Sequence, residues 1–152
     1  MLQARKLIDL IEAHSDDLTA KVVALLRGHR FTVGYRRIED LALSRRVRAL
    51  YSHLGYWIRS SSDLELEDAF FALGREHCRE GIPLPDVVAG QILTRRSLWE
   101  FVDEKAGDSA VELRGELDFQ GLVVRFFDRA LYHTVRGYEA EAKEESQAAR
   151  RR

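Results

Sequence analysis

Residues 116–138 read ELDFQGLVVRFFDRALYHTVRGY, a run that contains no proline. On a helix, the clearly charged face of this run is narrow and consists of Asp118, Arg125, Arg129 and Arg136. Almost every other position is apolar. A helix that is apolar around most of its circumference is buried between neighbours or shared with a partner chain. We therefore expect the other helices of the chain to pack around this one.

The apolar residues of this helix form two groups. One group recurs every seven residues and comprises Leu117, Val124, Leu131 and Tyr138. The other group lies on the far side of the helix and comprises Phe119, Leu122, Val123, Phe126, Phe127 and Ala130. We predict that two chains share this broad apolar surface in a homodimer. The expected interface residues are Phe119, Leu122, Val123, Phe126 and Ala130.

Asp128 interrupts the apolar pattern, because it lies close to the seven-residue row. A buried carboxylate needs a donor, since an unpaired buried charge is very costly. Arg95 can reach Asp128 if the two helices that carry them pack antiparallel. We predict a partly buried Arg95–Asp128 pair, with Gln91 or Tyr132 completing its hydrogen bonds. This cluster either fixes the packing of the two helices or lines a small ligand pocket.

The remaining pattern is helical throughout, and no segment alternates with the period of two that is typical of strands. A first helix is expected over about 2–27, interrupted at His14, with Ser15 as a possible cap of the second segment. Ser62 followed by Glu65 is a capping-box signature. The other expected helices cover about 38–59, 63–81, 84–105 and 110–114, the last leading into the long helix. We predict an all-α, globin-like bundle of five to seven helices with a long, mostly buried C-terminal helix.

The domain boundary is predicted near residue 140. The pattern of apolar residues ends after Tyr138, and residues 139–152 are mostly Ala, Glu, Lys, Gln and Arg. We expect residues 1–140 to form the domain and residues 141–152 to form a charged helical tail or linker.

Size and charge exclude several classes of protein. The chain has 152 residues, which is typical of one domain, and its net charge of −1 gives no basic field for nucleic acid. The single cysteine, Cys78, excludes a disulfide within the chain. No apolar run is long enough for a membrane span, and no signal-peptide core is present at the N-terminus. We expect a cytoplasmic protein that binds neither nucleic acid nor membrane.

Five segments together carry a family resemblance. They are LIDLIEAH at 7–14, GIPL at 81–84, RRSLWEF at 95–101, RFFDRAL at 125–131 and RGY at 136–138. With these segments the chain resembles the RsbRD-type N-terminal domain, the sensory domain of RsbR-like stressosome proteins. The resemblance implies a dimeric, globin-like helical fold without haem that serves as a sensory or protein-interaction module. It also implies a regulatory or stressosome-type partner. In RsbR-like proteins a C-terminal helix leads to a STAS domain, and this sequence ends where such a domain would begin.

Candidate chemical sites are few. His77 lies on the apolar stripe of its helix, where it is either a haem ligand or a packed core histidine. Cys78 is either a redox sensor activated by Arg75 and Arg79 or an inert thiol. The five histidines have no metal-binding spacing, and no nucleophile or nucleotide-binding motif is present. We expect no enzymatic activity, no catalytic residues, no metal and no cofactor.

Two main interpretations of function remain. The first is a non-enzymatic signalling module of bacterial stress-response type that acts as a dimer through its long helices. The alternative is a globin-like protein that carries haem or a small molecule in its helical core. A helical scaffold whose only activity is dimerisation is a third possibility.

Overall fold

The computed structural model describes residues 2–60, 62–105 and 110–152. Within these residues the chain is all-helical, which confirms the predicted fold class. The α-helices are α1 (Leu2–Ala13), α2 (Ser15–Gly28), α3 (Asp40–Ser52), α4 (Asp63–Arg79), α5 (Leu84–Lys105) and α6 (Ala110–Arg150). A 3₁₀ helix, η1 (Val33–Arg37), precedes α3, and a π-helical turn, η2 (Tyr56–Ser60), follows it. No described helix is long and apolar enough to cross a membrane.

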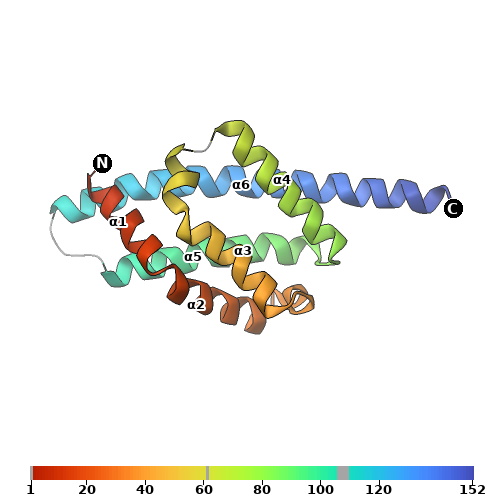
Figure 1. Ribbon diagram of the computed structural model, residues 1–152, viewed down its shortest axis with the longest axis horizontal. Coiled ribbons are helices and arrows are strands. Elements are labelled where there is room, and N and C mark those ends of the chain that lie inside the picture. The colour runs from red at the N-terminus through yellow and green to blue at the C-terminus, as the bar shows by residue number, and fades with distance from the viewer. Residues whose placement is uncertain (1, 61, 106–109) are drawn as a thin grey trace.

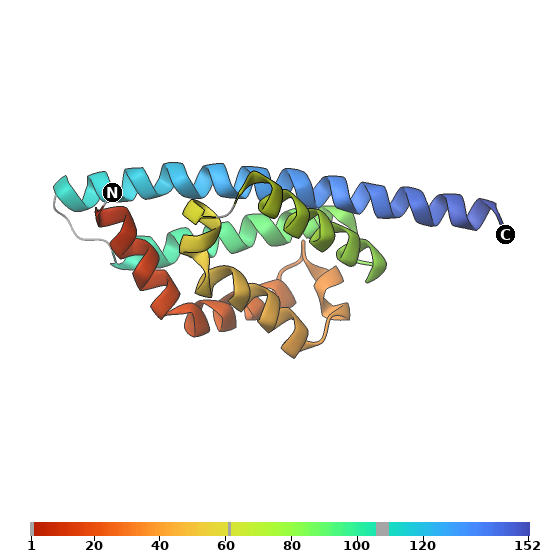
Figure 2. The same cartoon turned by 45° about the horizontal axis from the view of Figure 1, so that its top comes forward.

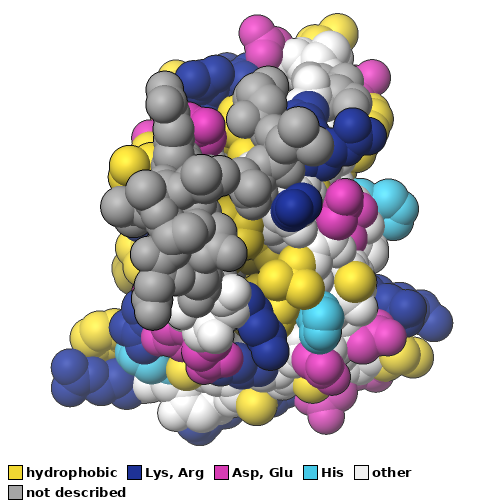
Figure 3. All heavy atoms as spheres, turned by 90° about the vertical axis from the view of Figure 1, so that its left-hand side faces the viewer, with side chains coloured by type: hydrophobic (Ala, Val, Ile, Leu, Met, Phe, Trp, Pro, Cys, Tyr) yellow, Lys and Arg dark blue, Asp and Glu magenta, His cyan; other side chains and the backbone are white. Residues whose placement is uncertain are grey.

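The long helix α6 is the axis of the molecule (Figures 1 and 2). It packs against α4, α1 and α5, whereas α2 packs against α3 and α5. The C-terminal part of α6 extends past the other helices, and every residue after Glu141 is exposed. At the end of the molecule where α1 begins, acidic and basic side chains are mixed on the surface (Figure 3). The expected long C-terminal helix is therefore present, but it is buried along one face rather than around most of its circumference.

The predicted dimer interface was wrong, because its residues belong to the core of a single chain. Phe119, Val123, Phe126 and Ala130 are all at most 3% exposed, and Leu122 packs against the same core. The helices of the same chain cover this side of α6. These side chains are consequently not available to a partner chain. The opposite side of α6 is exposed instead.

Most helix ends agree with the pattern in the sequence. The first helix breaks at His14, but Ser15 does not cap the next segment; it is the buried first residue of α2. The Ser62 hydroxyl accepts a hydrogen bond from the Glu65 amide over 3.1 Å, so the predicted cap is confirmed. The predicted second helix was too long at both ends, since α3 begins only at Asp40 and ends at Ser52, before the turn η2. The predicted short helix at 110–114 is the first part of α6.

Helices α4 and α6 cross in backbone contact. A Cβ atom added at Gly74 would lie 1.9 Å from the Thr134 carbonyl oxygen, and one added at Gly137 would lie 2.0 Å from the Phe71 carbonyl oxygen. Real Cβ atoms do not approach backbone atoms so closely. The two glycines therefore allow the helices to pack at a distance that no other residue would permit.

A core cavity and the long helix beside it

A cavity of about 290 Å³, partly open to solvent, lies among the helices and reaches into the core. Its volume is near the lower end of the range for small-molecule sites, which begins at about 300 Å³. Apolar side chains form most of its wall, and α2 to α6, η1 and η2 all contribute. The lining residues are Leu26, Tyr35, Leu43, Arg46, Val47, Ala49, Leu50, Trp57, Ala69, Phe70, Leu73, His77, Gly90, Gln91, Thr94, Phe126, Phe127 and Ala130.

His77 is a buried titratable group in the cavity wall, beside the buried Tyr35. Its Nδ1 atom lies 3.4 Å from a Glu80 carboxylate oxygen but has no hydrogen-bond partner in the structure. Burial, and next the positive charge of Arg46, lower the pKa of His77 from 6.5 to about 4, although Glu80 partly opposes the shift. The imidazole is therefore neutral at neutral pH, and its ring lies against the edge of Tyr35 at a centroid distance of 5.6 Å.

The lowered pKa of His77 predicts a specific loss of stability in acid. Below pH 6.5 the unfolded chain protonates His77 while the folded chain does not, so protons favour unfolding as the pH falls toward 4. The loss reaches about 3 kcal/mol near pH 4, because each pKa unit corresponds to about 1.4 kcal/mol. We expect urea unfolding of His77→Gln to lack this component between pH 6.5 and 4. Equal pH dependence in the two proteins would contradict a buried neutral His77.

A chain of hydrogen bonds fixes the orientation of Gln91 in the cavity wall. The Thr134 hydroxyl donates to the Ala130 carbonyl over 2.7 Å, as a buried helical threonine often does. Its oxygen therefore accepts the bond of 2.8 Å from the Gln91 side-chain nitrogen. The side-chain oxygen of Gln91 is buried and has no partner. This oxygen is thus an acceptor without a donor, in a position that a water-sized molecule does not reach.

The predicted polar cluster around Asp128 is only partly present. Arg95 and Asp128 approach each other to 4.0 Å, but their side chains are 36% and 65% exposed. Tyr132 is 60% exposed as well. The predicted pair is present, but the prediction that it is partly buried was wrong for Asp128, which lies on the outward face of α6. Of the four predicted residues, only Gln91 lines the cavity.

Arg46 is the charged side chain that lines the cavity among the described residues, and it was not one of the predicted site residues. Its guanidinium donates to Glu80 over 2.8 and 2.9 Å and to Glu76 over 2.8 Å. These bonds join α3 to the end of α4. Two carboxylates therefore already surround the guanidinium.

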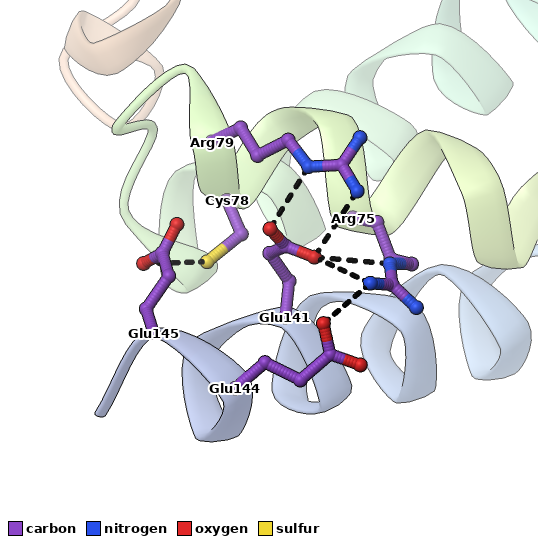
Figure 4. A network of polar contacts seen from close by, with 6 residues as sticks. All are labelled: Arg75, Cys78, Arg79, Glu141, Glu144 and Glu145. Carbon is purple, nitrogen blue, oxygen red and sulfur yellow. Dashed lines mark hydrogen bonds and ion pairs between the residues drawn. The ribbon is translucent and has the colours of Figure 1, made fainter. Parts of the chain in front are cut away.

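A second ionic cluster joins α4 to the far part of α6 (Figure 4). Glu141 accepts hydrogen bonds from Arg75 over 3.0 Å and from Arg79 over 2.8 Å. Arg75 also contacts Glu144 over 2.6 Å. The bond from Arg79 is the largest of the causes that lower the pKa of Glu141. This cluster, with the neighbouring contact of Cys78 and Glu145, joins α6 to α4 near the start of the exposed tail.

Removing the Glu141 charge is expected to loosen the end of α6. In Glu141→Gln the two arginines lose their shared carboxylate, so the last turns of the helix open more often. We expect faster hydrogen exchange of the amides of residues 141–150, with little change in residues 119–134. Glu139→Gln is the matched control, because Glu139 is exposed on the same helix. If both variants exchange like the original chain, the cluster does not hold the helix.

The surroundings of Cys78 disagree with the redox hypothesis. Its thiol lies 3.8 Å from a Glu145 carboxylate oxygen. Burial, followed by the negative charges of Glu145 and Glu141, raises the pKa of Cys78, and Arg79 opposes this only in part. A thiol with a raised pKa is less reactive. Of the two alternatives for Cys78, this environment favours the inert thiol over the redox sensor.

The exposed face of α6 carries apolar side chains. Leu117 is 59% exposed, Val124 is 39% exposed, and Leu131 and Val135 are half-buried. We call these four residues the outer row. Tyr132 lies beside the outer row and contacts the Arg136 guanidinium at 5.8 Å from its ring centroid.

Together these features define an all-helical module with a core cavity and a long helix that leaves the domain. In the described residues no group of three or more His, Cys, Asp or Glu side chains is arranged to hold a metal ion. Residues 16–152 match the family described as RsbT co-antagonist protein rsbRD N-terminal domain, and the chain belongs to this family. The match indicates a stress-response signalling domain, as the resemblance predicted. No curated protein and no solved structure matches the chain significantly.

Proposed function

We propose that the chain is a non-enzymatic sensory module that acts as a homodimer and passes its signal to a regulatory protein partner. The observation that carries this proposal is the position of α6. Phe126, Phe127 and Ala130 of α6 line the cavity, while Val124 and Leu131 project outward from the same turns. A change at the cavity can thus reach the outer surface through one helix.

The outer row supports pairing of two α6 helices. Leu117, Val124 and Leu131 are seven residues apart, which is the repeat of a helix that packs along a partner helix. An exposed apolar row on a long helix favours association, because pairing removes it from water. We propose that the two α6 helices run parallel, with the outer rows in contact. Both tails then leave the dimer at the same end.

The tail supports a role in contacting a partner protein. Residues 142–152 are fully outside the core and carry both acidic and basic side chains. Glu141 ties the start of this segment to α4 through Arg75 and Arg79. A shift of α6 relative to α4 would therefore change the presentation of the tail.

The molar mass in solution tests this proposal. The chain has a mass of 17.5 kDa, so we expect light scattering to give about twice that value from low to high micromolar concentration. A monomer throughout would overturn the dimeric module. An absorbance spectrum of the same peak tests the haem alternative, in which His77 would bind the iron. A Soret band would favour the haem alternative. A colourless protein would favour the sensory module over the haem protein.

A further inference from the structure

We propose that the segment between α2 and α3 is a docking surface for an acidic segment of a partner protein that also carries apolar side chains. The segment comprises residues 29–37 and includes η1, and we call it the basic connection. It is orange in Figures 1 and 2 and lies on the side of the fold away from α6. The surface is separate from the outer row and from the tail, so the inference goes beyond the proposed function.

Two large apolar side chains of the basic connection are exposed. Phe31 is 55% exposed and Val33 is 47% exposed. They alternate with the buried residues Thr32 and Gly34, so the exposed pair points outward from the fold. The Arg30 guanidinium lies over the Phe31 ring, 4.6 Å from the ring centroid. An aromatic ring and an arginine on one surface are typical of the residues that contribute most to protein interfaces.

The backbone of the basic connection is fixed by contacts with the rest of the chain. The Thr32 hydroxyl donates to the Leu26 carbonyl over 2.7 Å. The Gly34 amide donates to an Asp86 carboxylate oxygen over 2.8 Å. A Cβ atom at Gly34 would lie 2.7 Å from the Pro83 side chain, so the backbone rests directly on the start of α5. A surface that is ordered before binding loses less conformational entropy when a partner docks.

Three guanidinium groups of the basic connection form no ion pair with a described carboxylate. They belong to Arg30, Arg36 and Arg37, which are all exposed. Arg36 donates to the Arg27 carbonyl over 3.0 Å. Arg37 donates to the Gly81 carbonyl over 2.8 Å. A backbone carbonyl carries no net charge, so the three positive charges remain available to the carboxylates of a partner.

The acidic residues beside the basic connection favour a protein segment over a larger anionic surface. Glu39 and Asp40 lie just after the connection, and both are exposed. A membrane or a nucleic acid presents negative charge over a wide surface and would meet these carboxylates together with the arginines. A peptide segment can place its carboxylates beside the arginines and its apolar side chains on Phe31 and Val33. The surface therefore fits a partner in which acidic and apolar residues are mixed.

The inner side of the basic connection borders the cavity. Tyr35 of η1 lines the cavity, and its ring contacts that of His77. Val33 and Arg36 belong to the same 3₁₀ helix but are exposed. A docked partner therefore rests on an element that also forms part of the cavity wall.

Peptide selection on the immobilised full chain tests this inference. A displayed library of random peptides is selected, and the enriched peptides are synthesised for fluorescence anisotropy. We expect these peptides to combine Asp or Glu with Leu, Phe or Trp. We expect Phe31→Ser and Arg36→Glu each to weaken their binding at least about tenfold. Enrichment of basic peptides, or no enriched peptide at all, would overturn the inference.

Two variants and one modified peptide control for unspecific effects. Leu64→Ser and Lys6→Glu change an exposed apolar and an exposed basic residue at other places and are expected to bind like the original chain. Peptides with lysine in place of their acidic residues are expected to bind Arg36→Glu more tightly than the original chain. Equal binding by the original chain, Phe31→Ser and Arg36→Glu would show that the peptides dock elsewhere. Circular dichroism checks that all variants retain their helices.

Phosphatidylglycerol vesicles test a membrane as the occupant of this surface. We expect no sedimentation of the chain with these vesicles. Sedimentation that is lost in Phe31→Ser would assign the surface to a membrane and overturn the inference.

The molar mass of the same samples separates this inference from the proposed function. A dimer that selects no acidic peptide contradicts only the docking surface. A monomer that binds such peptides at the basic connection contradicts only the dimeric module.

Discussion

Gly137→Ala is expected to destabilise the folded chain by at least about 3 kcal/mol. The new Cβ atom would lie 2.0 Å from the Phe71 carbonyl oxygen, 2.7 Å from the Phe71 carbonyl carbon and 2.9 Å from its Cα atom. These are backbone atoms of α4, so no side-chain rotation relieves the overlap. The two helices must move apart, and the packing along their whole contact weakens. Chemical denaturation at a fixed protein concentration measures the effect.

Gly121→Ala is the control for this prediction. Gly121 lies on the same helix, and a Cβ atom there would meet nothing within 4 Å. Alanine is favoured over glycine in a helix by up to about 1 kcal/mol, so this variant should be as stable as the original chain or slightly more stable. If Gly137→Ala also left the free energy of unfolding unchanged, that result would contradict the close crossing of α4 and α6. Gly74→Ala gives a second test of the same contact from α4.

Leu131→Glu is expected to weaken dimerisation at least 100-fold. Leu131 is half-buried in the single chain and belongs to the outer row. A glutamate there would be desolvated at the proposed interface, and in each chain it would lie near Asp128 on the same face of α6. A 100-fold change in the dissociation constant corresponds to about 2.7 kcal/mol. Sedimentation velocity over a concentration series measures the change.

Leu64→Glu controls for the introduction of a charged residue at an exposed leucine. Leu64 is 66% exposed near the start of α4, and it is not part of the outer row. This variant should retain the mass of the original chain. Circular dichroism of both variants checks that the helices are intact. Equal masses of Leu131→Glu and the original chain would exclude the outer row as the interface.

The helices themselves could be predicted from the sequence because their signals are local. The period of apolar residues gave α5 with its observed limits, and Ser62 with Glu65 marked the start of α4. The break at His14 was also visible. The turn η2 was not visible; next to it the Gly55 amide donates to a Glu12 carboxylate oxygen over 2.7 Å, a contact between residues far apart in the sequence. Tertiary contacts of this kind have no local signature.

The orientation of α6 could not be derived from its apolar pattern. Apolar residues occur on nearly all sides of this helix, so two different faces qualified as the buried one. The small residues of α6 would have indicated its buried face more reliably than its large apolar residues. Ala130, Thr134 and Gly137 lie on one side of the helix, where α4 approaches closely. A series of small residues is typical of a close helix contact, and it favours the buried face that the structure has.

The cavity was also beyond sequence analysis. His77 and Gln91 were recognised as unusual polar residues on apolar faces, and both line the cavity. Arg46 was not recognised, since an arginine among other arginines on α3 resembles a solvated surface residue. A cavity arises where side chains from several helices fail to meet. That property belongs to the assembled core and not to any one segment.

Disulfide cross-linking at Val124 tests whether two chains pair through the outward face of α6. In a Cys78→Ser background, Val124→Cys would place two thiols at the proposed interface, within the Cα separation of about 4–7 Å that a disulfide needs. We expect rapid formation of a covalent dimer under mild oxidation, whereas we expect Leu64→Cys in the same background to stay monomeric on a denaturing gel. Cross-linking of Leu64→Cys but not of Val124→Cys, or of neither variant, would exclude this pairing of the helices.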